Sequence, residues 1–112
     1  MSDITQHLDE ATLSELREMM ESEFEFLIST FIEDSRQRLE EIRDTLDDPN
    51  AFSRACHSLK GSATNLGLPL LSELCREGEE LGHTGTIVAG DDLVNRIETE
   101  FDEVVQRLQD FL

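Results

Sequence analysis

The chain has 112 residues, the length of one ordinary domain, and we expect a single domain over residues 1–112. It carries 26 acidic residues against 9 Lys and Arg, which gives a formal net charge of −17 at pH 7. A surface of this charge repels phosphate backbones, so neither nucleic acid nor an anionic membrane is expected as a partner.

The first residues and the cysteines indicate the cellular compartment of the protein. No basic region followed by an apolar run opens the chain, so no signal peptide is predicted, and no segment is long and apolar enough to span a bilayer. Cys56 and Cys75 fall on the inward sides of predicted helices, where free thiols are expected rather than a disulfide. We therefore expect a cytoplasmic protein.

Apolar residues recur at helical spacing along nearly the whole chain, which predicts an all-α fold. A short first helix is expected over residues 9–21 and a long second helix over residues 22–47. Ser22 and Glu25 have the spacing of a capping box, which would begin the long helix. The sequence Asp47-Asp48-Pro49-Asn50 is expected to end it.

A third helix is expected to end near Leu66, with Gly67 as its left-handed C-terminal residue and Pro69 opening a fourth helix. The glycine-containing residues 82–90 predict a loop, and a last helix follows from about residue 91. Four apolar stripes joined by short connections favour an antiparallel four-helix bundle, with the additional short N-terminal helix capping one end.

The third helix carries a histidine on the side that faces away from the core. At about 100° per residue, one sector of this helix collects the apolar side chains of Phe52, Ala55, Cys56, Leu59, Ala63 and Leu66. His57 points roughly 150° away from the centre of that sector. Its expected neighbours on the exposed side are Ser53, Lys60, Gly61 and Thr64. An exposed neutral imidazole is available as a nucleophile near neutral pH.

The residues that follow His57 favour phosphate chemistry. Gly61 lies inside a predicted helix, where glycine costs about 1 kcal/mol relative to alanine, and its missing side chain would let another molecule approach the ring. The Lys60 ammonium is a suitable point charge for phosphate oxygens. Phosphoryl transfer also needs a metal and positioned charges, so we expect a partner to contribute Mg²⁺ and acid groups.

The run His57-Ser58-Leu59-Lys60-Gly61-Ser62, continued by Asn65-Leu66-Gly67, Leu71, Leu74-Cys75 and Glu79, resembles the signature of histidine-containing phosphotransfer (HPt) domains. The resemblance covers most of the chain and extends to stand-alone bacterial members. It implies that His57 is the phosphoacceptor, that Lys60 steadies the phosphoryl oxygens and that Gly61 leaves the approach open. Glu79 stands where the family carries a Glu or Gln that hydrogen-bonds the imidazole. Gly78 departs from the family pattern, in which a bulky apolar residue is more common.

The resemblance also implies the partners. These are the receiver domains of a hybrid sensor kinase and of a response regulator, with Mg²⁺ on the receiver and no cofactor on this chain. The protein is expected to be a monomeric phosphoryl carrier rather than an enzyme, since no Gly-rich phosphate loop or Ser/His/Asp set is present. A helical adaptor that binds receiver or kinase domains without being phosphorylated is the main alternative, and a histidine kinase fragment is a third.

Several residues also have ordinary structural interpretations. Glu79 could equally be one more solvated carboxylate, and Thr64 and Ser53 could be small polar residues that keep a docking face flat. Cys56, His57, Cys75 and His83 lack the spacing of paired metal ligands, so no metal site is expected. His7 and His83 are expected in solvated loop or terminal segments.

Overall fold

The computed structural model describes the backbone of residues 4–112 and the side chains of residues 6–112. Within this range the chain forms helices and no strand: α1 (Ile4–His7), α2 (Glu10–Met20), the 3-10 helix η1 (Glu21–Glu23), α3 (Phe24–Asp44), α4 (Pro49–Asn65), α5 (Pro69–His83) and α6 (Gly90–Phe111). The predicted all-α class is therefore confirmed for the described residues, with four longer helices and short N-terminal pieces.

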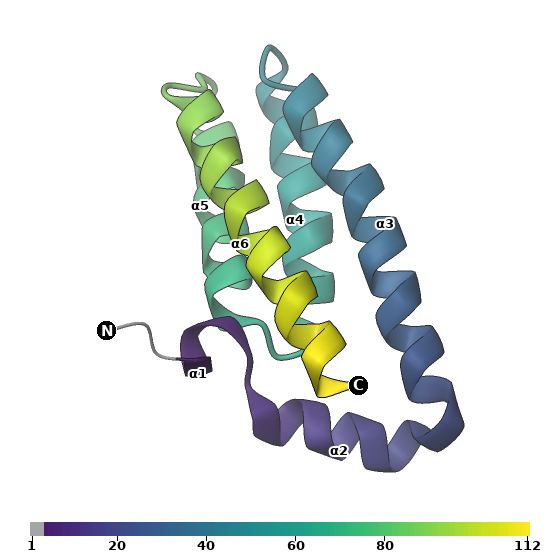
Figure 1. The fold of residues 1–112 in the computed structure, drawn as a ribbon. Helices are drawn as coiled ribbons and strands as arrows, with labels where there is room; N and C mark the ends of the chain where they lie inside the picture. The colour runs from purple at the N-terminus through teal and green to yellow at the C-terminus, as the bar shows by residue number, and fades with distance from the viewer. Residues whose placement is uncertain (1–3) are drawn as a thin grey trace.

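The four longer helices lie side by side, and α2 runs across one end of them (Figure 1). The turn between α4 and α5 is at the α2 end, whereas the α3–α4 and α5–α6 connections are at the other end. Helix α4 contacts α3 and α5, and α6 contacts the same two helices. Helices α4 and α6 therefore occupy opposite corners of the bundle.

Several helix ends follow the local signals in the sequence. Asp9 and Asp48 are the N-caps of α2 and α4, and each side chain accepts a hydrogen bond from a backbone N–H of the first turn. Pro49 and Pro69 open α4 and α5. Gly67 has the predicted left-handed conformation, with φ of 72°.

Other helix ends differ from the prediction. The capping box of Ser22 and Glu25 does not form, because residues 21–23 form η1 and α3 begins without a side-chain cap hydrogen bond. Helix α3 ends at residue 44 rather than near residue 47, and the Thr45 N–H bonds to the carbonyl of Ile42, three residues back, instead of continuing the α-helical pattern. Residues 82–83 extend α5 instead of lying in a loop, since Gly82 packs against α4.

The core contains the predicted apolar stripes. Its largest fully buried side chains include Leu13 from α2, Ile28 from α3, Phe52 from α4, Leu71 from α5 and Phe101 from α6. Burying a side chain of this size stabilises the fold by roughly 2 kcal/mol relative to leaving it in water. No helix in the described part of the chain has the length and apolar character needed to cross a membrane.

The prediction of a solvated His7 is wrong. Its side chain is buried, and Nδ1 lies 2.9 Å from Oε1 and 2.8 Å from Oε2 of Glu100. The short helix α1 packs against α5 and α6, which encloses the ring. Burial raises the pKa of the Glu100 carboxyl, and the His7 hydrogen bond opposes this effect. His83, by contrast, is exposed as expected.

Candidate functional site

His57 lies in the middle of α4 and its side chain is 67% exposed. Cys56 and Leu59, on the opposite side of the same helix, are fully buried. This agrees with the orientation expected from helical spacing. The imidazole is thus held on a rigid element while its ring stays open to solvent.

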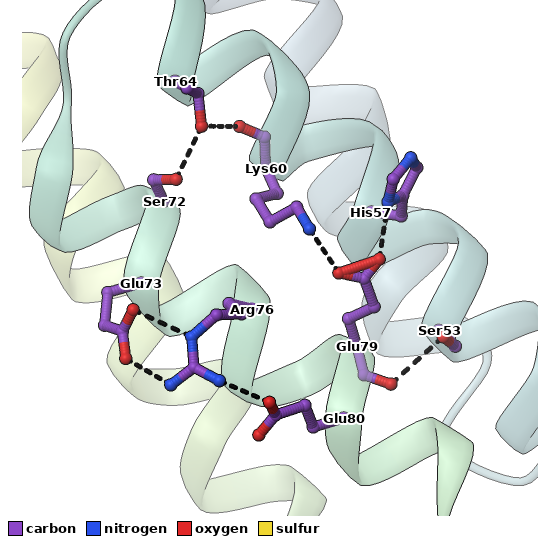
Figure 2. Close-up of polar contacts among 9 residues, drawn as sticks. All are labelled: Ser53, His57, Lys60, Thr64, Ser72, Glu73, Arg76, Glu79 and Glu80. Atoms are coloured by element: carbon purple, nitrogen blue, oxygen red, sulfur yellow. Dashed lines mark hydrogen bonds and ion pairs between the residues drawn. The ribbon is translucent and has the colours of Figure 1, made fainter.

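One carboxylate on the neighbouring helix contacts both His57 and Lys60 (Figure 2). Glu79 Oε2 lies 2.5 Å from His57 Nδ1, and Glu79 Oε1 lies 2.5 Å from Lys60 Nζ. The Glu79 side chain is 15% exposed and that of Lys60 is 29% exposed, so water only partly screens these contacts. The three side chains of the sequence motif, two on α4 and one on α5, therefore meet at the contact between these helices.

The charge of Glu79 determines the proton position on the histidine ring. The hydrogen bond from Lys60, with a smaller contribution from His57, holds the pKa of Glu79 below its ordinary value despite partial burial. An ionised carboxylate only accepts hydrogen bonds, so the His57 Nδ1 in contact with it carries a proton. The other ring nitrogen, Nε2, points away from Glu79 (Figure 2). In the neutral ring, Nε2 therefore holds the free lone pair.

Two glycines of α5 allow this close contact between the helices. A Cβ atom at Gly78 would lie 2.5 Å from Cys56 Sγ, and one at Gly82 would lie 2.6 Å from the Pro49 carbonyl oxygen. Only hydrogen atoms fit at these two positions, which are one turn apart on one face of α5. The departure of Gly78 from the family pattern thus has a packing reason, because it faces the Cys56 side chain.

Ser53 is not on the exposed surface, contrary to the prediction. It is 5% exposed, and its hydroxyl donates a hydrogen bond of 3.1 Å to the backbone carbonyl of Glu79. The contact joins α4 to the turn of α5 that carries the site carboxylate. Helical spacing places Ser53 closer to His57 than to the apolar stripe, so the spacing along α4 gave no signal of this helix contact.

Thr64 also joins the two helices. Its hydroxyl donates to the Lys60 carbonyl oxygen at 2.8 Å and lies 2.7 Å from the Ser72 Oγ of α5. The described contacts of Thr64 are with Lys60 and Ser72, and none is with the His57 ring. Thr64 therefore stabilises the helix pair beside the site, as Figure 2 shows.

Gly61 is exposed, and a Cβ atom built there would meet no atom within 4 Å. Packing within the described chain therefore does not require glycine at this position. This differs from Gly78 and Gly82, where neighbouring atoms leave no room for a side chain. The surface next to His57 is open at Gly61, as the sequence indicated.

Both cysteines are free and buried. Burial, with a smaller effect of the Glu79 charge, raises the pKa of Cys56 to about 12, and burial raises the pKa of Cys75 as well. Neither thiol is therefore a nucleophile at neutral pH. Among the described residues, no three His, Cys, Asp or Glu side chains are grouped in a way that could hold a metal ion.

Comparison with known proteins agrees with this fold. The family model of the Hpt domain matches residues 27–110, so the chain belongs to the Hpt domain family. The crystal structure of histidine-containing phosphotransfer protein B (HptB) from Pseudomonas aeruginosa PAO1 is similar, with a TM-score of 0.89 and 35% sequence identity. The match covers 93% of this chain and 92% of that chain. A search of curated proteins found no match.

Proposed function

We propose that this protein is a phosphoryl carrier of a multistep phosphorelay. His57 accepts a phosphoryl group from an aspartate of one receiver domain and passes it to an aspartate of another. Membership of the Hpt family supports a role in histidine phosphotransfer. The hydrogen bond between Glu79 and His57 Nδ1 is the observation that carries the proposal, because it leaves Nε2 free and exposed.

The proposed transfer needs no proton movement at the attacking atom. The Nε2 lone pair forms a bond to phosphorus while the bond between phosphorus and the receiver's aspartate oxygen breaks, and that carboxylate leaves. The ring then has a phosphoryl group on Nε2 and a proton on Nδ1, and carries a positive charge. Glu79 at 2.5 Å from Nδ1 offsets this charge. Reversal of the same steps delivers the phosphoryl group to the second receiver.

Lys60 changes partners in this proposal. Before transfer its ammonium is bonded to Glu79, on the same side of α4 as His57. The phosphoryl oxygens that arrive on Nε2 are stronger acceptors, and the Lys60 side chain is long enough to turn toward them. Lys60 would then stabilise the transferred group, while Glu79 keeps its hydrogen bond to the ring.

We also propose the helix order, the partners, the compartment and the oligomeric state of the protein. The short connections at alternate ends of the helices support an antiparallel order for the bundle (Figure 1). The donor and acceptor are the receivers of a hybrid sensor kinase and of a response regulator, and the receiver supplies Mg²⁺. We further propose a cytoplasmic monomer, since two free buried thiols suit a reducing compartment.

The test is transfer of labelled phosphate from a phosphorylated receiver to the purified protein. Wild-type protein and an H83Q variant, which loses the other exposed histidine, should both acquire acid-labile label. An H57Q variant should acquire none while keeping the same far-ultraviolet circular dichroism. Label on H57Q would contradict the role of His57, and a wild-type protein that binds receivers without acquiring label would be an adaptor instead.

A further inference from the structure

Arg54 differs from the other basic residues of the chain in having no partner among the described residues. Of the nine Lys and Arg side chains, the others each contact a carboxylate, a carbonyl oxygen or an aromatic ring within the described residues: Arg17, Arg36, Arg38, Arg43, Lys60, Arg76, Arg96 and Arg107. Arg54 is exposed and forms no hydrogen bond or ion pair with any described residue. An unpaired arginine is unexpected in a chain with a net charge of −17, where carboxylates are abundant.

The position of Arg54 relates it to the phosphoacceptor site. It precedes His57 by three residues on α4, so the two side chains are neighbours on the exposed surface of one helix. It also lines an open groove of about 350 Å³ between α3 and α4, together with Arg38, Glu41, Thr45, Ala51, Ala55 and Ser58. The groove thus lies on the α3 side of α4, and Arg54 stands on the helix surface between it and His57.

The groove is more basic than the rest of the molecule. It contains two arginines and one glutamate, and that glutamate is paired with Arg38 at 3.0 Å. The alanines at positions 51 and 55 add no long side chain to its lining. The Arg54 guanidinium is therefore free to bind an acidic group of another molecule.

A receiver domain that docks on His57 brings carboxylates with it, because its phosphorylation site must hold Mg²⁺. Two acidic surfaces repel each other, and at physiological ionic strength only charges within about 8 Å of the contact have much effect. A cation at the rim can offset this repulsion and raise the rate of encounter. A guanidinium also binds a carboxylate in bidentate fashion.

We infer that Arg54 binds an Asp or Glu side chain at the rim of the receiver's phosphorylation site and thereby sets the rate of productive encounter. This inference rests on the proposed phosphotransfer function. On the Arg54 side of His57, the edge of the docked receiver then lies over the α3–α4 groove. Arg54 is in this view a docking residue, and the chemical step belongs to His57.

The test compares R54Q with R96Q in rapid-quench measurements of transfer from a phosphorylated receiver, over a range of receiver and salt concentrations. Both variants lose one positive charge, but Arg96 lies on α6, at the opposite corner of the bundle from α4. R54Q should lower the apparent second-order rate constant about fivefold at low salt, weaken its salt dependence and leave the rate at saturating receiver unchanged. R54K should keep most of the wild-type rate, and R96Q all of it.

The outcomes separate this inference from the proposed function. Equal effects of R54Q and R96Q would mean that only net charge matters, and would overturn the inference. A lower saturating rate with an unchanged second-order rate constant would also overturn it, since Arg54 would then act on the chemical step. A wild-type protein that acquires no label would contradict the proposed function itself, and with it the inference about Arg54.

Discussion

Gly78 lies directly against Cys56, and a Cβ atom at position 78 would be only 2.5 Å from the Cys56 Sγ. Each of these packing residues immediately precedes a residue of the site, Glu79 in one helix and His57 in the other. The contact therefore sets the separation of α4 and α5 at the level where the carboxylate meets the imidazole. A buried packing pair thus aligns the exposed functional pair next to it.

Removing the Glu79 carboxylate should slow phosphotransfer. We expect E79A to transfer about tenfold more slowly than wild type, because a hydrogen bond to a charged group contributes about 1.5 kcal/mol. E79Q should recover part of the rate, since the amide oxygen still accepts from Nδ1. E80A is the matched control, because Glu80 is bonded to Arg76 and not to the site (Figure 2). Rapid-quench kinetics in which E79A and E80A behave alike would contradict the role of Glu79.

The contribution of Glu79 to stability should depend on pH. Its hydrogen bonds to Lys60 and His57 hold its pKa below the ordinary value of 4.5, so ionisation favours the folded state. This stabilisation is complete above the unfolded pKa and is lost as the pH falls through the lowered folded pKa. We expect E79Q to be about 1 kcal/mol less stable than wild type at pH 6, with little difference at pH 3. Urea unfolding at several pH values measures this difference in stability. An equal difference at pH 3 and pH 6 would contradict a stabilising role of the ionised Glu79 carboxylate.

The glycines of the site should respond oppositely to alanine. G61A should raise the free energy of unfolding by about 0.5–1 kcal/mol, because its Cβ meets no atom within 4 Å and alanine favours the helix. G82A should lower it by about 2 kcal/mol, because its Cβ would lie 2.6 Å from a backbone oxygen. Thermal and urea unfolding give both values. If receivers dock over Gly61, G61A should transfer phosphate several times more slowly than wild type although it is more stable. G61L should transfer more slowly still. Normal transfer by G61L would show that the receiver does not use the opening at Gly61.

The buried pair of His7 and Glu100 should act as a unit. H7A should lose about 2 kcal/mol of stability at pH 7, because it leaves a buried carboxylate without its hydrogen-bond donor. Since burial raises the pKa of Glu100, the loss should shrink as the pH falls and the carboxyl becomes neutral. The double variant H7L/E100L should recover most of the stability. A double-mutant cycle of H7L, E100L and H7L/E100L, measured by urea unfolding, checks this, and strictly additive losses would mean that the pair is not coupled.

The sequence predicted well those features that depend on neighbouring residues. The spacing of apolar residues on α4 indicates both its buried face and the outward direction of His57. Gly67 and Pro69 mark the turn between α4 and α5 where the structure has it. The same local rules failed at Ser22, where the chain turns the corner between α2 and α3 through η1, and at Ser53, whose burial depends on α5.

Apart from α1 and η1, the sequence by itself therefore determined the helices, the core stripes and the exposure of His57 and Gly61, because these follow from 3.6 residues per turn along one segment. The family resemblance indicated the contact of Glu79 with His57, which the structure shows. Only the tertiary structure decided that Glu79 also contacts Lys60, that Ser53 bonds to α5, and that His7 is buried against Glu100. These contacts join separate segments, so they depend on how closely two helices approach. That distance depends on the side-chain volumes of both helices together, so it cannot be read from either segment alone.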